Sequence, residues 1–251
     1  MRNRSIPAGV CILLFLALIL AVKTIDVQVI GPEATSIGLA TINGMIHEAT
    51  GVQMIWYKIT SYLGILSILV GVCFACVGLV QLIRRRSLLK VDAEILSLGC
   101  LYVILAVLYI LFEFLIINER PIIMPGDEHV EASFPSSHTL LSFVILGSAM
   151  IVIGKYVRSR KLCILIQAVS GVLILIAVFG RLLSGVHWFT DILGSIFLSV
   201  SLLFLFAGSL DLRRDEIRHR IYNRSSGSIA GGPIHKPLKS CCASIFPPVV
   251  K

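Results

Sequence analysis

The hydrophobic positions of this 251-residue chain fall into six long runs that are separated by shorter polar segments. The runs cover, approximately, residues 8–25, 57–83, 96–117, 139–157, 162–183 and 188–210. A helix needs about 20 apolar residues to cross the hydrocarbon layer of a bilayer, and each run comes close to that length. The pattern therefore predicts an all-α protein, a polytopic membrane helix bundle with six transmembrane helices.

The composition supports a membrane protein and argues against a soluble domain. Hydrophobic residues make up 57% of the chain, charged residues only 14%, and the mean hydropathy is +0.93. We expect one membrane domain over residues 1–212. Residues 213–251 are predicted to form a basic cytoplasmic tail, which is rich in Ser, Gly and Pro beyond Asn223 and is expected to be disordered there. Cys241 and Cys242 in this tail are either lipidated or plain thiols.

The distribution of Lys and Arg predicts the orientation in the membrane. If the N-terminus is cytoplasmic, 18 of the 22 Lys and Arg residues lie on the cytoplasmic side, as the positive-inside rule requires. We therefore expect a protein of the plasma membrane with both termini in the cytoplasm. Anionic lipid at the cytoplasmic face accounts for the net charge of +8, and no nucleic acid partner is needed.

Polar residues collect where two of the runs meet the external face. Ser136, Ser137 and His138 follow Pro135 and precede an apolar run, which suits the start of a helix with a serine N-cap. The N-terminus of a helix offers free N–H groups and the positive end of the helix dipole, so it attracts phosphate. A histidine in the first turn can pass a proton to a bound phosphoester.

A second polar group lies downstream at the same face. Arg181 comes six residues before His187, and His187 comes four residues before Asp191. On a helix the last two would share a face, so the carboxylate could orient the imidazole. Arg181 and the upstream Arg120 each offer a bidentate fork for phosphate oxygens. Together these residues predict a site for phosphoryl transfer at the extracytoplasmic face.

The same residues resemble the motifs of the type 2 phosphatidic acid phosphatase family, membrane lipid phosphatases that share their site with the vanadium haloperoxidases. The second and third motifs appear as Pro135-Ser136-Ser137-His138 and as Gly180-Arg181 with His187 and Asp191. A serine replaces the usual glycine of the second motif, and Gly180 replaces the leading serine of the third. In the first motif Arg120-Pro121 is present, but the lysine seven residues earlier is replaced by Glu113. The three motifs lie within residues 113–191, and the N-terminal third of the chain carries none of them.

The resemblance implies hydrolysis of a lipid phosphomonoester or diphosphate without a metal or other cofactor. It implies that His187 is the nucleophile that forms a phosphohistidine, that Asp191 holds its tautomer, and that His138 is the proton donor and acceptor. The phosphate ligands would be Arg120, Arg181, Ser136 and the N–H groups around Ser137. Phosphatidic acid, phosphatidylglycerol phosphate and a polyprenyl diphosphate all fit as membrane lipid substrates, and no residue distinguishes among them.

Two features leave alternatives open. Glu113 either pairs with Arg120 across a helix or adjusts the choice of substrate, by taking a proton or by meeting a cationic headgroup. Residues 26–56 form the longest external loop, and its scattered apolar residues indicate a short interfacial helix. That loop is either a lid or lateral gate for lipid, or a segment that packs its apolar side onto the membrane.

Two other functions compete with a lipid phosphatase. Charged residues inside a membrane are functional in small transporters as well, but transporters tend to show repeated halves and a site at the midplane. Here the polar groups gather at one face. An inactive relative kept for interaction is the second competitor, because Glu113 departs from the family pattern. No metal site is predicted in the acidic loop 118–137, because the spacing of its His, Asp and Glu residues matches no familiar metal-binding motif.

Overall fold

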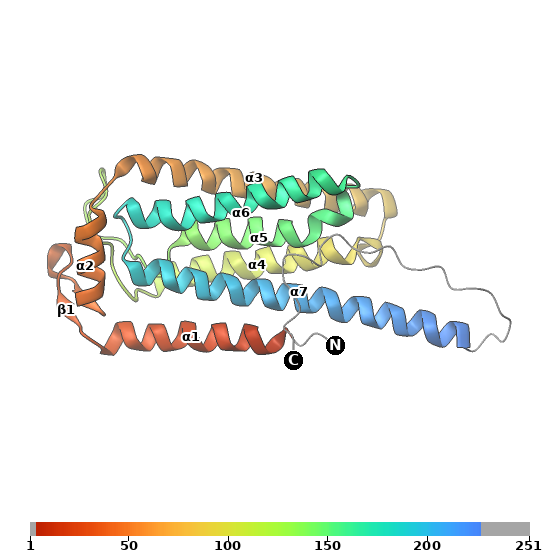
Figure 1. The fold of residues 1–251 in the computed structure, drawn as a ribbon, viewed down its shortest axis with the longest axis horizontal. Helices are drawn as coiled ribbons and strands as arrows, with labels where there is room; N and C mark the ends of the chain where they lie inside the picture. Colours follow the sequence, from red (N-terminus) through yellow and green to blue (C-terminus); the bar gives the residue numbers. More distant parts are fainter. Residues whose placement is uncertain (1–3, 227–251) are drawn as a thin grey trace.

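Six long helices lie side by side in this protein, with their axes roughly parallel (Figure 1). The computed structural model describes residues 4–226, with side-chain surroundings as far as residue 216. The long helices are α1 (Ser5–Thr24), α3 (Met54–Arg85), α4 (Ala93–Phe114), α5 (Ser137–Tyr156), α6 (Arg160–Leu183) and α7 (Phe189–Ser226). All six are long and apolar enough to cross a membrane. The predicted all-α bundle with six spans is confirmed.

Two of the six helices form the centre of the bundle. Within their most apolar stretches, 56% of the residues of α5 and of α7 are buried, against 17–28% in the other four spans. The outer helices present apolar side chains such as Leu13, Ile65 and Val103 to their surroundings, which is the pattern expected where lipid is the solvent. The N-termini of the two central helices carry the residues predicted for catalysis.

Short elements cover the end of the bundle where α5 and α7 begin. These are β1 (Gln28–Val29), η1 (Pro32–Ala34), β2 (Ser36–Ile37) and α2 (Ala40–Thr50), and β1 pairs with β2 in an antiparallel ribbon. Figure 1 shows α2 lying across this end of the bundle. The short helix expected within residues 26–56 is therefore present. A further short helical turn, η2 (Leu88–Lys90), lies in the connection between α3 and α4.

The long helix α7 continues past the predicted end of the membrane domain. Residues 213–226 extend α7 as helix, so the boundary expected at residue 212 falls inside a single element. The helix α7 packs along α1, where the Ser201 hydroxyl donates a hydrogen bond to the Ala8 carbonyl at 2.9 Å. Cys241, Cys242 and the rest of the expected tail lie outside the described residues.

Candidate active site

A tight turn between α6 and α7 carries His187. Gly185 adopts a φ of +67°, in the left-handed region that favours glycine. A Cβ atom at this position would also lie 2.5 Å from the Gly51 carbonyl oxygen, so a side chain does not fit. The turn is closed on its other side by Asp191, whose Oδ2 accepts the Trp188 N–H at 2.9 Å. The backbone around His187 is thus fixed from both sides.

The His187 ring is buried and makes its hydrogen bond to a main-chain group. Its Nδ1 donates to the Ser133 carbonyl at 3.1 Å and lies 3.7 Å from Asp191 Oδ2, beyond hydrogen-bonding distance. The Ser133 carbonyl can only accept, so the geometry assigns the proton to Nδ1 and the free lone pair to Nε2. Burial, with the charges of Arg181 and Arg120, holds the pKa of His187 well below its usual value. At neutral pH the imidazole is therefore uncharged.

The two serines of the second motif have different surroundings. Ser136 is fully buried, and its hydroxyl lies 3.1 Å from Thr139 Oγ1. Its N–H donates to the Asp191 carbonyl, and its carbonyl accepts the Ser195 hydroxyl at 2.9 Å. Ser136 occupies the N-cap position as predicted, but its side chain makes no capping bond. In this structure it joins the start of α5 to α7.

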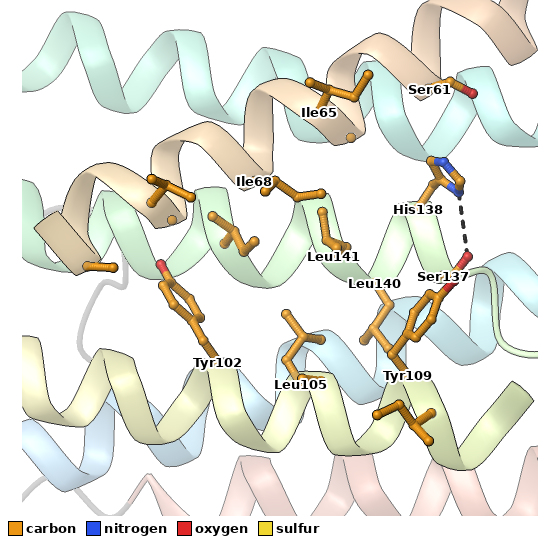
Figure 2. Close-up of a pocket in the computed structure, with 17 residues that line it drawn as sticks. Ser61, Ile65, Ile68, Tyr102, Leu105, Tyr109, Ser137, His138, Leu140 and Leu141 are labelled. Carbon is orange, nitrogen blue, oxygen red and sulfur yellow. Dashed lines mark hydrogen bonds between the residues drawn. The ribbon is translucent and has the colours of Figure 1, made fainter.

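Ser137 and His138, in the first turn of α5, are partly buried. Figure 2 shows their side chains together, with Ser137 Oγ 3.5 Å from His138 Nδ1. The His138 ring also packs on α3 at Gly64, where an added Cβ atom would lie 3.0 Å from the ring. The charges of Arg181 and Arg120 reach His138 as they reach His187. Both imidazoles thus share one electropositive environment.

Arg181 is a buried cation without a carboxylate partner among the residues whose side chains the structure describes. Only 1% of its surface is exposed, and none of the ion pairs among residues 4–216 involves it. Its guanidinium carbon lies 4.8 Å from the centre of the Tyr57 ring, and its Nη2 donates to the Ser61 hydroxyl at 3.4 Å. A buried charge without a counter-ion is costly, so this arrangement suits an anion as the missing partner.

Arg120 lies in the loop between α4 and α5 and pairs with Glu131. The distance from Arg120 Nη2 to Glu131 Oε2 is 2.9 Å. The alternative pairing of Arg120 with Glu113 is not formed, because α4 ends at Phe114 and helical periodicity does not extend to residue 120. Within the described residues Glu113 makes no ion pair.

A small polar pocket joins the residues that the sequence singled out. It has a volume of about 190 Å³, and its lining includes Glu113, Arg120, Glu131, Ser137, His138 and His187. Arg181, Asp191 and Ser136 are buried and do not line this pocket. His138 and His187, which are 49 positions apart in the chain, therefore face a common pocket at one end of the bundle.

A larger apolar cavity adjoins the polar pocket. It has a volume of about 650 Å³ and lies between α3, α4 and α5, with His138 near one end and Tyr102 near the other (Figure 2). Four residues line both cavities: Tyr109, Ser137, His138 and Leu140. Away from this junction the lining is mostly aliphatic. The two cavities together suit a molecule with a charged end and an apolar chain.

Several contributors to the site are not visible in the sequence. The Ser133 carbonyl is a main-chain atom that any residue would supply, so it leaves no signal. Tyr57 and Ser61 lie in α3, which carries none of the three motifs, yet both contact Arg181. Glu131 is one of several acidic residues in its loop, and only the fold shows which one meets Arg120.

Known proteins resemble this chain over part of its sequence and in its fold. The family model of the PAP2 superfamily matches residues 113–214. The fold resembles the crystal structure of a transmembrane PAP2 type phosphatidylglycerolphosphate phosphatase from Bacillus subtilis, with a TM-score of 0.59 and 20% sequence identity. The match covers 81% of this chain and 96% of that one. No curated protein sequence matches the chain significantly.

Proposed function

Because this chain belongs to the PAP2 superfamily of membrane phosphatases, we propose that it hydrolyses the phosphate ester or diphosphate of a membrane lipid. The observation that carries the proposal is the junction of the two cavities at His138. A lipid phosphate placed there has its charged group among cations and imidazoles and its chain in the aliphatic cavity. A water-soluble phosphoester would leave that cavity empty.

The reaction follows from the free Nε2 atom of His187. Nε2 attacks phosphorus, the N–P bond forms, and the bond from phosphorus to the leaving oxygen breaks. His138, which takes up a proton when the negatively charged phosphate binds beside it, delivers that proton to the leaving oxygen. Water then attacks the phosphohistidine, His138 takes its proton, and the N–P bond breaks to release phosphate. Asp191 lies close enough to stabilise the charge that the His187 ring acquires in the intermediate.

Two arginines and one helix terminus would hold the phosphate oxygens. Arg181 brings an uncompensated charge from within the bundle, and Arg120 reaches the pocket from the loop. Ser137 adds a hydroxyl and the N–H groups at the start of α5. Electrostatic stabilisation dominates phosphoryl transfer, so loss of either arginine should lower the rate on the order of a hundredfold. The buried Ser136 would act through packing.

The site's place in the cell is part of the proposal. The charge distribution favours cytoplasmic termini in a plasma membrane, which would put the pocket, and α2 above it, at the extracytoplasmic face. The opposite end, with Arg84, Arg85 and Arg86, would then meet anionic lipid. We also propose that the chain consists of a membrane domain followed by a basic cytoplasmic tail, with the boundary inside α7.

The substrate would be phosphatidic acid, phosphatidylglycerol phosphate or a polyprenyl diphosphate. Each of these lipids has a terminal phosphate on an apolar chain and suits the joined cavities. The similar structure from Bacillus subtilis is named for phosphatidylglycerolphosphate, which makes that lipid a natural first test here. Glu113, within the polar pocket, would tune the choice among headgroups.

Phosphate release from these three lipids tests the proposal. We expect the purified protein to release phosphate from at least one of them in the presence of a metal chelator. His187→Ala and His138→Ala should abolish release. His129→Ala is the matched control, since this exposed histidine pairs with Glu33 outside the pocket. Release that survives His187→Ala would overturn the mechanism, and no release by the unaltered protein would favour an inactive relative or a transporter.

A further inference from the structure

The helix α2, in the N-terminal part of the chain, caps the start of α7. Asn43 is fully buried, and its Oδ1 accepts the Thr190 N–H at 3.2 Å. Its Nδ2 donates to Thr190 Oγ1 at 3.0 Å and to the Gly38 carbonyl at 2.9 Å. The first N–H groups of a helix have no partner within the helix. A side chain 147 positions earlier supplies one here, which makes Asn43 a capping residue supplied by another part of the fold.

The same segment supports the turn that carries His187. The ring of His47 lies 5.3 Å from the ring of Trp188, and the Gly51 carbonyl faces Gly185. Trp188 in turn donates its indole N–H to the Glu119 carbonyl at 2.7 Å, next to Arg120. The turn is therefore held between α2 on one side and the loop with Arg120 on the other.

We propose that Asn43 is a positioning residue for the active site, and that α2 fixes the geometry of His187 by fixing the start of α7. This inference rests on the proposed function. His187 precedes the first residue of α7 by two positions, so no helical hydrogen bond of its own holds it in place. Its ring faces the Ser133 carbonyl only while the turn and the 115–136 loop keep their separation. Asp191 lies beside Thr190 in the chain, so the cap helps to position both His187 and Asp191.

The inference gives residues 26–56 a different role from a lid or a passive membrane contact. The polar side chain of Asn43 faces the catalytic turn, while Ile42 and Met45 on the same helix are exposed. A segment that only rested on the membrane would have no need for a buried amide with three hydrogen bonds. A lid would close over the pocket, but no residue of α2 lines either cavity.

The test compares Asn43→Ala with Ser201→Ala. Each substitution removes a buried side-chain hydrogen bond between α7 and another segment. Ser201, however, lies eleven residues, or about 16 Å, further along α7 than Thr190, the partner of Asn43. A catalytic group displaced by about 1 Å can cost about a hundredfold in rate. We expect Asn43→Ala to lower kcat by about ten- to a hundredfold, with KM changed less than about threefold. Ser201→Ala should leave both near their original values.

Asn43→Asp provides the conservative rescue. Full burial favours the protonated carboxyl, which accepts the Thr190 N–H and donates its O–H to the Gly38 carbonyl as the amide does, so kcat should recover most of the loss. Nitrogen NMR of labelled histidine gives a second readout that needs no turnover. The unaltered protein and Ser201→Ala should show His187 with its proton on Nδ1, and Asn43→Ala should lose this signature.

The outcomes separate this inference from the proposed function. If Asn43→Ala retains kcat as well as Ser201→Ala does, or if its His187 spectrum is unchanged, Asn43 has no positioning role. A loss that Asn43→Asp does not rescue would also overturn the inference. If the unaltered protein releases no phosphate from any lipid, the proposed function fails, while the histidine spectra still decide whether Asn43 positions the ring.

Discussion

The Nδ1–H of His187 donates to the main-chain carbonyl of Ser133 at 3.1 Å. A carbonyl that accepts this proton leaves the lone pair on Nε2, which is the atom that faces the polar pocket if His187 acts as the nucleophile. The backbone of the 115–136 loop therefore sets the tautomer, and the Asp191 carboxylate at 3.7 Å has a different part. The Asp191 carboxylate accepts a hydrogen bond from the Trp188 N–H and lies close enough to stabilise a positive charge on the His187 ring.

These separate roles of the Ser133 carbonyl and Asp191 predict a mild effect of Asp191→Asn on kcat. Where a carboxylate alone sets the tautomer of a catalytic histidine, the same change costs about 10⁴ in kcat. Here the Ser133 carbonyl keeps the tautomer, so we expect a loss of only about ten- to a hundredfold, from weaker stabilisation of the charged ring. Phosphate release on the preferred lipid measures it, with His187→Ala as the zero point. A 10⁴-fold loss would mean that Asp191 takes over the Nδ1 proton when substrate is bound.

The buried, neutral state of His187 predicts how stability depends on pH. Burial and the two arginines lower its pKa in the folded protein, whereas in the unfolded chain it stays near 6.5. Below about pH 6.5 the unfolded state binds a proton that the folded state does not, so stability falls as the pH drops. Above that pH the residue contributes no dependence. Thermal unfolding in detergent between pH 5 and 8 should show this slope, and His187→Gln should reduce it.

The membrane helices could be predicted from the sequence because their signal is local and large. A run of about 20 apolar residues specifies a span whatever its neighbours are. The start of α5 could be predicted in the same way, since a proline, serine and histidine before an apolar run indicate a helix start. Both types of inference need only the nearest ten or twenty residues.

The contacts between segments could not be predicted in the same way. The spacing of His187 and Asp191 suggests a shared helical face, but α7 begins at Phe189, so His187 precedes the helix and turns toward Ser133. The seven-residue spacing of Glu113 and Arg120 fails for a similar reason, because α4 ends between them. Helical spacing arguments hold only within a helix, and the ends of these helices depend on tertiary contacts.

The ion pair of Arg120 with Glu131 predicts competition with the substrate. At 2.9 Å the Glu131 carboxylate accepts from the Arg120 guanidinium, whose N–H groups a substrate phosphate would need. Partly exposed ion pairs contribute up to about 1 kcal/mol, so Glu131→Gln should lower KM by about two- to fivefold with little change in kcat. Steady-state kinetics at low and moderate salt would show it. Glu128→Gln, in the same loop but not lining the pocket, is the control. An increase in KM would instead assign Glu131 to substrate binding.

The apolar cavity predicts a dependence on chain length. Gly71 lines the cavity, and a Cβ atom there would contact Tyr102 and Ile145 at 3.7 Å, so a larger side chain would project into the space. Gly71→Leu should therefore lower kcat/KM for a long-chain lipid phosphate about tenfold and leave a short-chain, water-soluble analogue unaffected. Gly171→Leu on α6 is the control, because nothing lies within 4 Å of that position. Equal losses on both substrates would mean that the cavity does not hold the chain.

Glu113 predicts a charge preference among lipid headgroups. It lies in the last turn of α4, where the helix dipole is negative, and lines the polar pocket without an ion-pair partner among the described residues. Two carboxylates there, with the Arg120 charge already shared with Glu131, disfavour a phosphate that brings only negative charge. A headgroup with its own ammonium group would meet Glu113 favourably, so the carboxylate would act as a selectivity device.

The change Glu113→Lys reverses this charge at the position where the family pattern has lysine. We expect kcat/KM for phosphatidic acid to rise several-fold, and kcat/KM for an amine-bearing lipid phosphate of similar chain length to fall. Glu48→Lys, an exposed residue of α2 at the same end of the bundle, controls for long-range steering, because it changes the net charge equally outside the pocket. If Glu113→Lys abolishes hydrolysis of both lipids, the carboxylate takes part in the reaction itself. If both rates stay the same, the headgroup does not reach α4.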